Sequence, residues 1–303
     1  MKTKPTFQRQ RLLIALLQSF GGTLTKLDLQ KLLFLFTQEY NGKKKAYEFV
    51  PYHYGCYSFQ ANSDVKTLSN YGLVTINKDD NLIELATEQY CHISDLKPTE
   101  QNMLMEFTNR YKDFSGDKLI SYVYNNYSYY TLNSKIAHKY IEKKYIKPKQ
   151  QALFEGSEQK FYTIGYEGIT FEKYINKLIE NDIEILCDVR KNPYSMKFGF
   201  TKNMLKHTLE QIGIQYVHIP ELGIESENRQ ELNCFEDYQK LFEMYNRTTL
   251  KTEKAVNALS FLNELVQNNK IALTCFEKDI EYCHRGVIAK NLQKEYSLMY
   301  TNL

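Results

Sequence analysis

The stretch ALTCFE at residues 272–277, followed by CHR at residues 283–285, decides the fold of the C-terminal half. Residues 271–275 form a short apolar run typical of a buried strand, and residues 286–293 have the apolar spacing of an amphipathic helix. Two thiols, a carboxylate, an imidazole and a guanidinium therefore meet at one strand-to-helix junction. Ligands bind at this edge of open α/β sheets, because helix N-termini there present unpaired N–H groups.

The same alternation of strand and helix extends upstream. Buried strands are predicted within residues 161–168, 183–189 and 215–218, and helices over residues 170–180, 202–211, 235–246 and 252–267. Nearly continuous apolar strands separated by helices are typical of a parallel sheet covered on both faces. We therefore predict an α/β domain with a mostly parallel sheet over residues 160–303.

Polar side chains follow each predicted strand. Crossover connections of one hand bring the loops after these strands to the same edge of the sheet. The set expected there is Tyr166, Glu167, Asp188, Arg190, Ser195, His218, Glu221, Glu277, Cys283, His284 and Arg285. Each member has a structural alternative, since Asp188, for example, can cap the next turn or pair with Arg190. The convergence of the whole set indicates a functional site.

The first chemistry that fits this set is a thiol enzyme. Cys283 or Cys275 would be the nucleophile, and His284 or His218 would carry the proton. The predicted catalytic residues are Cys283, His284, Glu277 and Asp188. Arg190 and Arg285 would bind an anionic group such as a phosphate. The predicted ligand-binding residues are Tyr166, Glu167, Arg190, Ser195, His218 and Arg285.

The second chemistry is a metal site for zinc or iron. Its ligands would be Cys275, Cys283, His284 and His218, which are soft and borderline donors. Adjacent Cys283 and His284 cannot easily bind one ion from a regular helix, although a loop would allow it. We favour the anion-binding enzyme and predict no cofactor, with zinc or iron as the alternative.

Several motifs of the C-terminal half occur together in one order. They are GYEG at 165–168, DVR at 188–190 with Pro193 and Ser195, YVHIPELG at 216–223, CFE at 275–277 and CHR at 283–285. Over about residues 160–295 this pattern resembles the bacterial and archaeal family called domain of unknown function 488. The resemblance implies an α/β fold, and the activity of that family is not settled. The DVR motif also resembles the entry strand of rhodanese-like domains, whose cysteine loop has a glycine spacing absent here.

The N-terminal half has no strand-helix alternation. Helices are predicted over residues 7–20, 26–40, 62–71, 102–113 and 133–144, and strands over 73–76 and 82–85 around a polar turn. This order favours a mainly helical, winged-helix-like domain over residues 1–150, with the boundary in the polar segment 145–159. The segments KLLF at 31–34 and PYHYGCYS at 51–58 resemble the antitoxin-like domain Panacea.

A winged-helix-like domain would bind nucleic acid or a protein partner. Lys43, Lys44 and Lys45 are the predicted phosphate contacts, and the alternative is that they form a solvated surface. The net charge of +3 is too small for attraction of nucleic acid by the whole chain. Any such binding must therefore come from a local patch.

Composition limits the cellular setting. No apolar run approaches the ~18 residues needed to cross a membrane, and the N-terminus is too polar for a signal peptide. The six cysteines lack Cys-x-x-Cys spacing, which fits a reducing cytoplasm. We expect a two-domain cytoplasmic enzyme that acts on a phosphate-bearing or nucleic-acid-derived substrate, in genome maintenance or in defence against phage or other mobile DNA. The alternative is a non-catalytic, ligand-sensing DNA-binding regulator.

Overall fold

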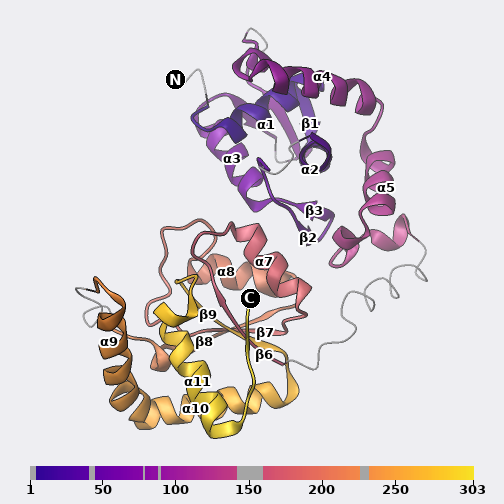
Figure 1. Ribbon diagram of the computed structural model, residues 1–303. Helices are drawn as coiled ribbons and strands as arrows, with labels where there is room; N and C mark the ends of the chain where they lie inside the picture. Colours follow the sequence, from indigo (N-terminus) through magenta and orange to yellow (C-terminus); the bar gives the residue numbers. More distant parts are fainter. Residues whose placement is uncertain (1–4, 41–44, 78, 88–89, 142–159, 226–231) are drawn as a thin grey trace. The chain divides into compact units, whose positions relative to one another are not determined.

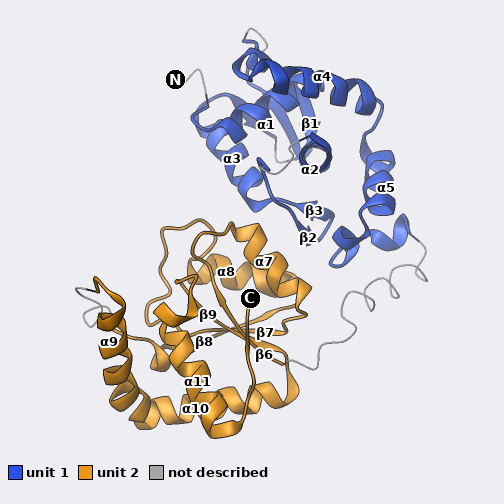
Figure 2. Ribbon diagram, viewed as in Figure 1, with its two compact units in different colours: residues 1–151 blue, residues 152–303 orange. Residues whose placement is uncertain are grey.

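The computed structural model describes residues 5–40, 45–77, 79–87, 90–141, 160–225 and 232–303. The chain divides into two compact units, residues 1–151 and 152–303, called the N-terminal and C-terminal units below (Figure 2). The predicted boundary segment, 145–159, lies outside the described residues.

The C-terminal unit is built on a five-stranded parallel sheet with the strand order β10-β6-β9-β7-β8 (Figure 1). The strands are β6 (Phe161–Gly165), β7 (Ile185–Asp188), β8 (Gln215–His218), β9 (Ile271–Cys275) and β10 (Thr301–Asn302). The predicted parallel α/β fold is confirmed. Strand β10 was not predicted, because a two-residue strand leaves no apolar run to recognise.

Helices cover both faces of this sheet (Figure 1). They are α7 (Phe171–Glu180), α8 (Lys202–Gln211), α9 (Phe235–Arg247), α10 (Glu253–Asn268) and α11 (His284–Tyr296). Alternate strand residues point to opposite faces. Cys187, Leu273 and Cys275 share one core with α9, α10 and α11. On the other face, the Tyr174 hydroxyl of α7 hydrogen-bonds the Thr274 hydroxyl at 2.7 Å.

The carboxyl ends of the strands are aligned. Gly165 is paired with Cys275, and Asp188 is paired with both Thr274 and His218. The strand ends that precede the predicted site residues therefore lie along one edge of the sheet. The central position of β9 places Cys275 between the ends of β6 and β7.

The N-terminal unit combines helices with a three-stranded antiparallel sheet of order β1-β5-β4 and a separate hairpin, β2-β3. Its helices are α1 (Gln8–Ser19), α2 (Lys26–Tyr40), α3 (Phe59–Asn70), α4 (Pro98–Tyr111) and α5 (Gly116–Asn126). Its strands are β1 (Thr23–Thr25), β2 (Val50–Tyr52), β3 (Gly55–Tyr57), β4 (Val74–Ile76) and β5 (Leu82–Leu85).

The helix predicted over residues 133–144 is wrong for the part that the structure describes. Residues 133–141 contain a 3-10 turn, Ala137–Lys139, and no α-helix. The Ser134 hydroxyl accepts a hydrogen bond from the backbone N–H of Ile136 at 3.2 Å, a local bond that competes with helix formation.

Within the described ranges, no helix combines the length and the apolar character needed to cross a bilayer.

Cys187 gives the C-terminal unit a predicted sensitivity to alkaline pH. Burial, with a smaller contribution from Asp188, raises the pKa of this thiol from 9.0 to about 12. Because the folded pKa is the higher one, the stabilising contribution is complete below the unfolded value and is lost as the pH rises toward 12. Relative to Cys187→Ala, we expect the wild type to lose about 1.4 kcal/mol of unfolding free energy per pH unit in this window. Urea unfolding of both proteins between about pH 8 and pH 11 measures the difference, and parallel pH profiles would refute it.

Candidate functional site

A buried ion pair lies at the end of β7 and is hydrogen-bonded by Tyr216 of β8. Arg190 donates from Nε to Asp188 Oδ1 at 2.8 Å and from Nη2 to Asp188 Oδ2 at 2.5 Å, and the Tyr216 hydroxyl donates to Oδ2 at 2.6 Å. The Asp188 side chain is fully buried. Both carboxylate oxygens of Asp188 accept hydrogen bonds from protein groups, so Asp188 positions Arg190. These bonds give no support to the predicted catalytic role of Asp188.

The remaining donors of Arg190 also bind protein groups. Nη1 donates to the Tyr166 hydroxyl at 2.8 Å and to the Phe200 carbonyl at 2.9 Å. Burial alone would lower the pKa of Arg190, but the bonds with Asp188 outweigh it and raise this pKa above its ordinary range. Arg190 was predicted to bind an anion directly. Its hydrogen bonds instead position Tyr166. The Tyr166 ring stacks on the Phe200 ring, with their centroids 4.2 Å apart.

A cavity of about 240 Å³ opens at this edge of the sheet. Its lining residues are Tyr166, Arg190, Lys191, Asn192, Tyr194, Ser195, Ile224, Cys275 and Phe276. Three predicted ligand-binding residues, Tyr166, Arg190 and Ser195, are among them. The lining has two cations and, as far as the described residues go, no carboxylate. Lys191 also contacts the exposed Glu225, with Nζ and Oε1 2.6 Å apart.

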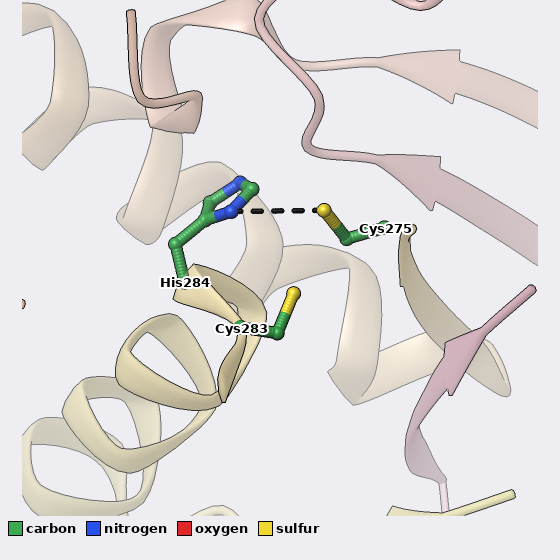
Figure 3. Close-up of side chains that lie close together, drawn as sticks. All are labelled: Cys275, Cys283 and His284. Carbon is green, nitrogen blue, oxygen red and sulfur yellow. Dashed lines mark hydrogen bonds between the residues drawn. The ribbon is translucent and has the colours of Figure 1, made fainter. Parts of the chain in front are cut away.

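A second feature lies at the same place: a buried cluster of Cys275, Cys283 and His284. Their Sγ and ring nitrogen atoms all lie within 4.8 Å of one another. Figure 3 shows Cys275 and the His284 ring facing each other, with the Cys283 sulfur directed toward the same space. Cys275 Sγ lies 3.6 Å from His284 Nδ1 and 3.4 Å from Glu277 Oε2. Cys275 therefore belongs to both the cavity and the cluster.

The convergence of two adjacent residues, Cys283 and His284, has a local cause. Cys283 is the N-cap of α11 and is extended, with φ −131° and ψ 135°, whereas His284 begins the helix. Two adjacent residues of a regular helix could not easily bind one ion, but the extended N-cap lets Cys283 and His284 face the same space. Gly286 permits the tight turn before the helix, because a Cβ there would lie 2.5 Å from the Ile280 carbonyl oxygen.

The orientation of the His284 ring sets its chemistry. Nε2 lies 2.9 Å from the Val189 carbonyl oxygen, which can only accept a hydrogen bond. In the neutral imidazole, Nε2 therefore carries the proton and donates it to Val189. Nδ1 then presents its lone pair to Cys275 Sγ, as a general base or a metal ligand does.

The two clustered thiols are not equivalent. Burial, with an addition from Cys275, raises the pKa of Cys283 well above its ordinary range. Among the described residues that line the cavity, Cys275 is included and Cys283 is not. Of the two nucleophiles named from the sequence, Cys275 therefore has the better placement.

Arg285 does not take the predicted anion-binding position. Its Nη1 donates to the Glu277 carbonyl at 2.5 Å and its Nη2 to the Lys278 carbonyl at 3.1 Å. The side chain is fully buried and fixes the loop after β9. Glu167, also predicted to bind ligand, is exposed and accepts the Lys278 backbone N–H at 2.9 Å.

His218 lies apart from the cluster, which corrects its place among the predicted metal ligands. Its Nε2 donates to the Arg190 carbonyl at 3.0 Å, and its Nδ1 lies 3.2 Å from Lys202 Nζ. Together with Glu221 it lines a separate cavity of about 440 Å³. The potential ligand group in the described residues is Cys275, Cys283 and His284.

In the N-terminal unit, two of the three predicted phosphate contacts, Lys43 and Lys44, lie outside the described residues. Lys45 is exposed, and its Nζ donates to Gln38 Oε1 at 3.3 Å. Tyr216 and Lys191 were not predicted as site residues. Tyr216 begins the YVHIPELG motif and Lys191 directly follows DVR, so their positions in or beside these motifs were the available signal.

The comparison with known families supports the C-terminal resemblance. Residues 170–292 match the family model described as Domain of unknown function DUF488. The DUF488 match begins at the N-terminus of α7 and ends within α11, so it includes Asp188, Cys275, Cys283 and His284. It does not extend to the N-terminal unit, whose Panacea and winged-helix likenesses stay predictions. No curated protein and no solved structure matches the chain.

Proposed function

We propose that the DUF488-like unit is an enzyme for a small anionic substrate, phosphate-bearing or nucleic-acid-derived, that binds in the cavity at the carboxyl edge of the sheet. One observation carries the proposal: Cys275 lines this cavity and also contacts His284 in the buried cluster. A substrate in the cavity would therefore meet the cluster at Cys275. Reactive side chains, or side chains with shifted pKa values, that gather in a polar cavity indicate an active site.

The cavity favours an anion over a cation or a neutral apolar ligand. Lys191 and Arg190 supply positive charge, and Asn192 and Ser195 supply further polar groups. Four of the five side-chain N–H donors of Arg190 bind protein groups, so direct contact with the anion falls mainly to Lys191. The chemistry would come from the cluster, either as a Cys275 thiolate formed by proton transfer to His284 Nδ1 or as a metal centre.

The substrate class is tested by calorimetric titration with inorganic phosphate and nucleoside phosphates. Lys191→Ala is expected to weaken phosphate binding about tenfold, because it removes one charge-assisted hydrogen bond. Lys206→Ala is the matched control, since Lys206 also pairs with an exposed carboxylate, Glu210, at 3.7 Å. Equal losses in the two variants, or no binding of any phosphate compound, would contradict the proposed substrate class.

Catalysis is tested with a panel of nucleotides and phosphorylated oligonucleotides, scored for product formation by the full chain. Cys275→Ser should lower turnover by at least about 100-fold, the scale of a lost catalytic group. Cys234→Ser should leave it unchanged, because Cys234 is an exposed cysteine. Binding without turnover across the panel would instead support the ligand-sensing regulator.

We further propose that the N-terminal unit is a winged-helix-like domain that binds nucleic acid through α3. Its order of helices and strands, with β1 pairing β5 and β5 pairing β4, agrees with that class. Helix α3 carries Asn62, Ser63 and the exposed Lys66 on its accessible surface. Its acid, Asp64, is buried and bound by Arg9, with Nε and Oδ2 2.7 Å apart. Amide side chains and a cation suit base edges and phosphates.

This second proposal is tested by mobility shift at low salt. Lys66→Ala should weaken binding across sequences and reduce the slope of affinity against salt by about one ion. Lys112→Ala, which removes an exposed lysine at the end of α4, is the control. If the full chain retards neither DNA nor RNA, the α3 interface is wrong.

A further inference from the structure

The buried cluster has the composition and the surroundings of a metal centre. We propose that Cys275, Cys283 and His284 bind one zinc ion, with a fourth coordination position that faces the cavity. The proposal deepens the proposed function, on which the catalytic use of such an ion rests. Two thiolates and one imidazole with an open fourth position are a donor set of catalytic zinc sites.

The donor atoms are already gathered. The two sulfurs and the ring nitrogen all lie within 4.8 Å of one another, so small side-chain movements would bring them to ligand distances. Each residue is about 1% exposed. Sulfur and imidazole donors select zinc-class ions over magnesium or calcium, which require oxygen ligands.

The His284 ring is held as metal-binding imidazoles are held. Such a ring almost always donates its other N–H to a carboxylate or a backbone carbonyl, which fixes the tautomer and aims the remaining lone pair. Here Nε2 lies 2.9 Å from the Val189 carbonyl, and Nδ1 faces Cys275. Val189 directly follows β7, so the second contact of the ring is anchored on the sheet.

The three ligands also come from ordered elements. Cys275 is the last residue of the central strand β9, Cys283 is the N-cap of α11, and His284 is its first residue. Sites on strand ends and helix starts keep their geometry better than sites on long loops. The Tyr245 and His284 rings pack in a T-shaped arrangement, with their centroids 6.0 Å apart.

A divalent ion would be matched in charge by this donor set. Zinc would bind the two cysteines as thiolates, with release of their protons, and two thiolates offset the charge of one divalent ion. Among the three ligands, Cys275 lines the cavity, so the side of the ion next to Cys275 is the side that a substrate reaches. Glu277, whose Oε2 lies 3.4 Å from Cys275 Sγ, stands beside that position.

The test is elemental analysis of the full chain, purified without chelator from medium supplied with zinc and iron. One zinc per chain is expected in the wild type and in Cys234→Ser. Cys283→Ser and His284→Ala should each lose most of it. Bound iron in place of zinc, or no metal above the background of the two ligand variants, overturns the proposal.

Misfolding of a ligand variant is excluded with the wild-type chain itself. Chelated wild type is titrated with cobalt(II), and a thiolate-to-cobalt charge-transfer band with release of about two protons is expected, one from each thiol. Absence of that band overturns the site even where the variants fail to fold. Phosphate titration of the same samples reports separately on the cavity, so loss of the metal proposal and loss of the substrate proposal are distinguished.

Glu277→Gln decides whether the fourth position is open. The variant should keep a full equivalent of zinc, because Glu277 lies beside the ion and is not one of the three ligands. Loss of the metal in this variant would make the site four-coordinate and closed. The cavity-facing position would then be wrong.

Discussion

Replacing Asp188 by alanine is expected to lower the free energy of unfolding of the C-terminal unit by about 3–5 kcal/mol. The change leaves the Arg190 guanidinium buried without its counter-charge, and it also removes the acceptor of the Tyr216 hydroxyl. A buried charge without a partner costs far more than an intact pair contributes. Urea unfolding of the full chain, followed by a signal from the C-terminal unit, gives the difference.

An exposed ion pair provides the comparison for this change. Glu210→Ala breaks the contact with Lys206, in which both side chains are about half exposed. Its expected cost is below about 1 kcal/mol, as for most surface pairs. Similar losses for Asp188→Ala and Glu210→Ala would show that the buried pair does not hold this edge of the sheet.

Gly165→Ala is expected to cost about 3 kcal/mol or more, the upper range for overpacking a well-packed interior. A Cβ on Gly165 would lie 1.9 Å from the Glu277 carbonyl oxygen and 3.1 Å from Arg285 Nη2. The nearest obstacle is backbone, so it cannot rotate away. Movement of the Glu277 carbonyl would also break its bond with Arg285, so phosphate affinity should fall with stability.

A neighbouring glycine separates this close contact from the general cost of losing a glycine. Gly168 lies in the same turn with φ +74°, and a Cβ there would meet nothing within 4 Å. Gly168→Asn should therefore cost less than about 1 kcal/mol, because asparagine tolerates this left-handed conformation. Thermal unfolding of both variants provides the comparison, and a Gly168→Asn loss equal to that of Gly165→Ala would refute the close-contact explanation.

The sequence predicted the C-terminal sheet because β6, β7 and β9 are short apolar runs and segments with helical apolar spacing separate the strands. It also predicted that the loops after these strands share the carboxyl edge, since parallel strands align their ends, but His218 and Glu221 line a cavity apart from the cysteine cluster. The sequence could not predict which acceptors the side-chain N–H groups of the site would bind. Arg190 and Arg285 both carry a guanidinium suited to an anion, yet their bonds run to Asp188 and to the Glu277 carbonyl.

The N-terminal unit was less predictable, because its strands are three or four residues long and its sheet pairs distant segments. The β2-β3 hairpin was not predicted. The failed prediction over residues 133–144 has a similar cause: local hydrogen bonds of Ser134, which apolar spacing does not reveal, favour turns.

The central claim, that Cys275 connects an anion-binding cavity to the buried cluster, is tested most directly by carboxymethylation. Metal-free protein is treated with iodoacetate, and each cysteine is followed by peptide mass spectrometry. Four cysteines are buried, namely Cys56, Cys187, Cys275 and Cys283. We predict that Cys275 reacts first among these four and that inorganic phosphate slows its reaction. A Cys275 rate no higher than that of Cys187, or a rate that phosphate leaves unchanged, would contradict the claim.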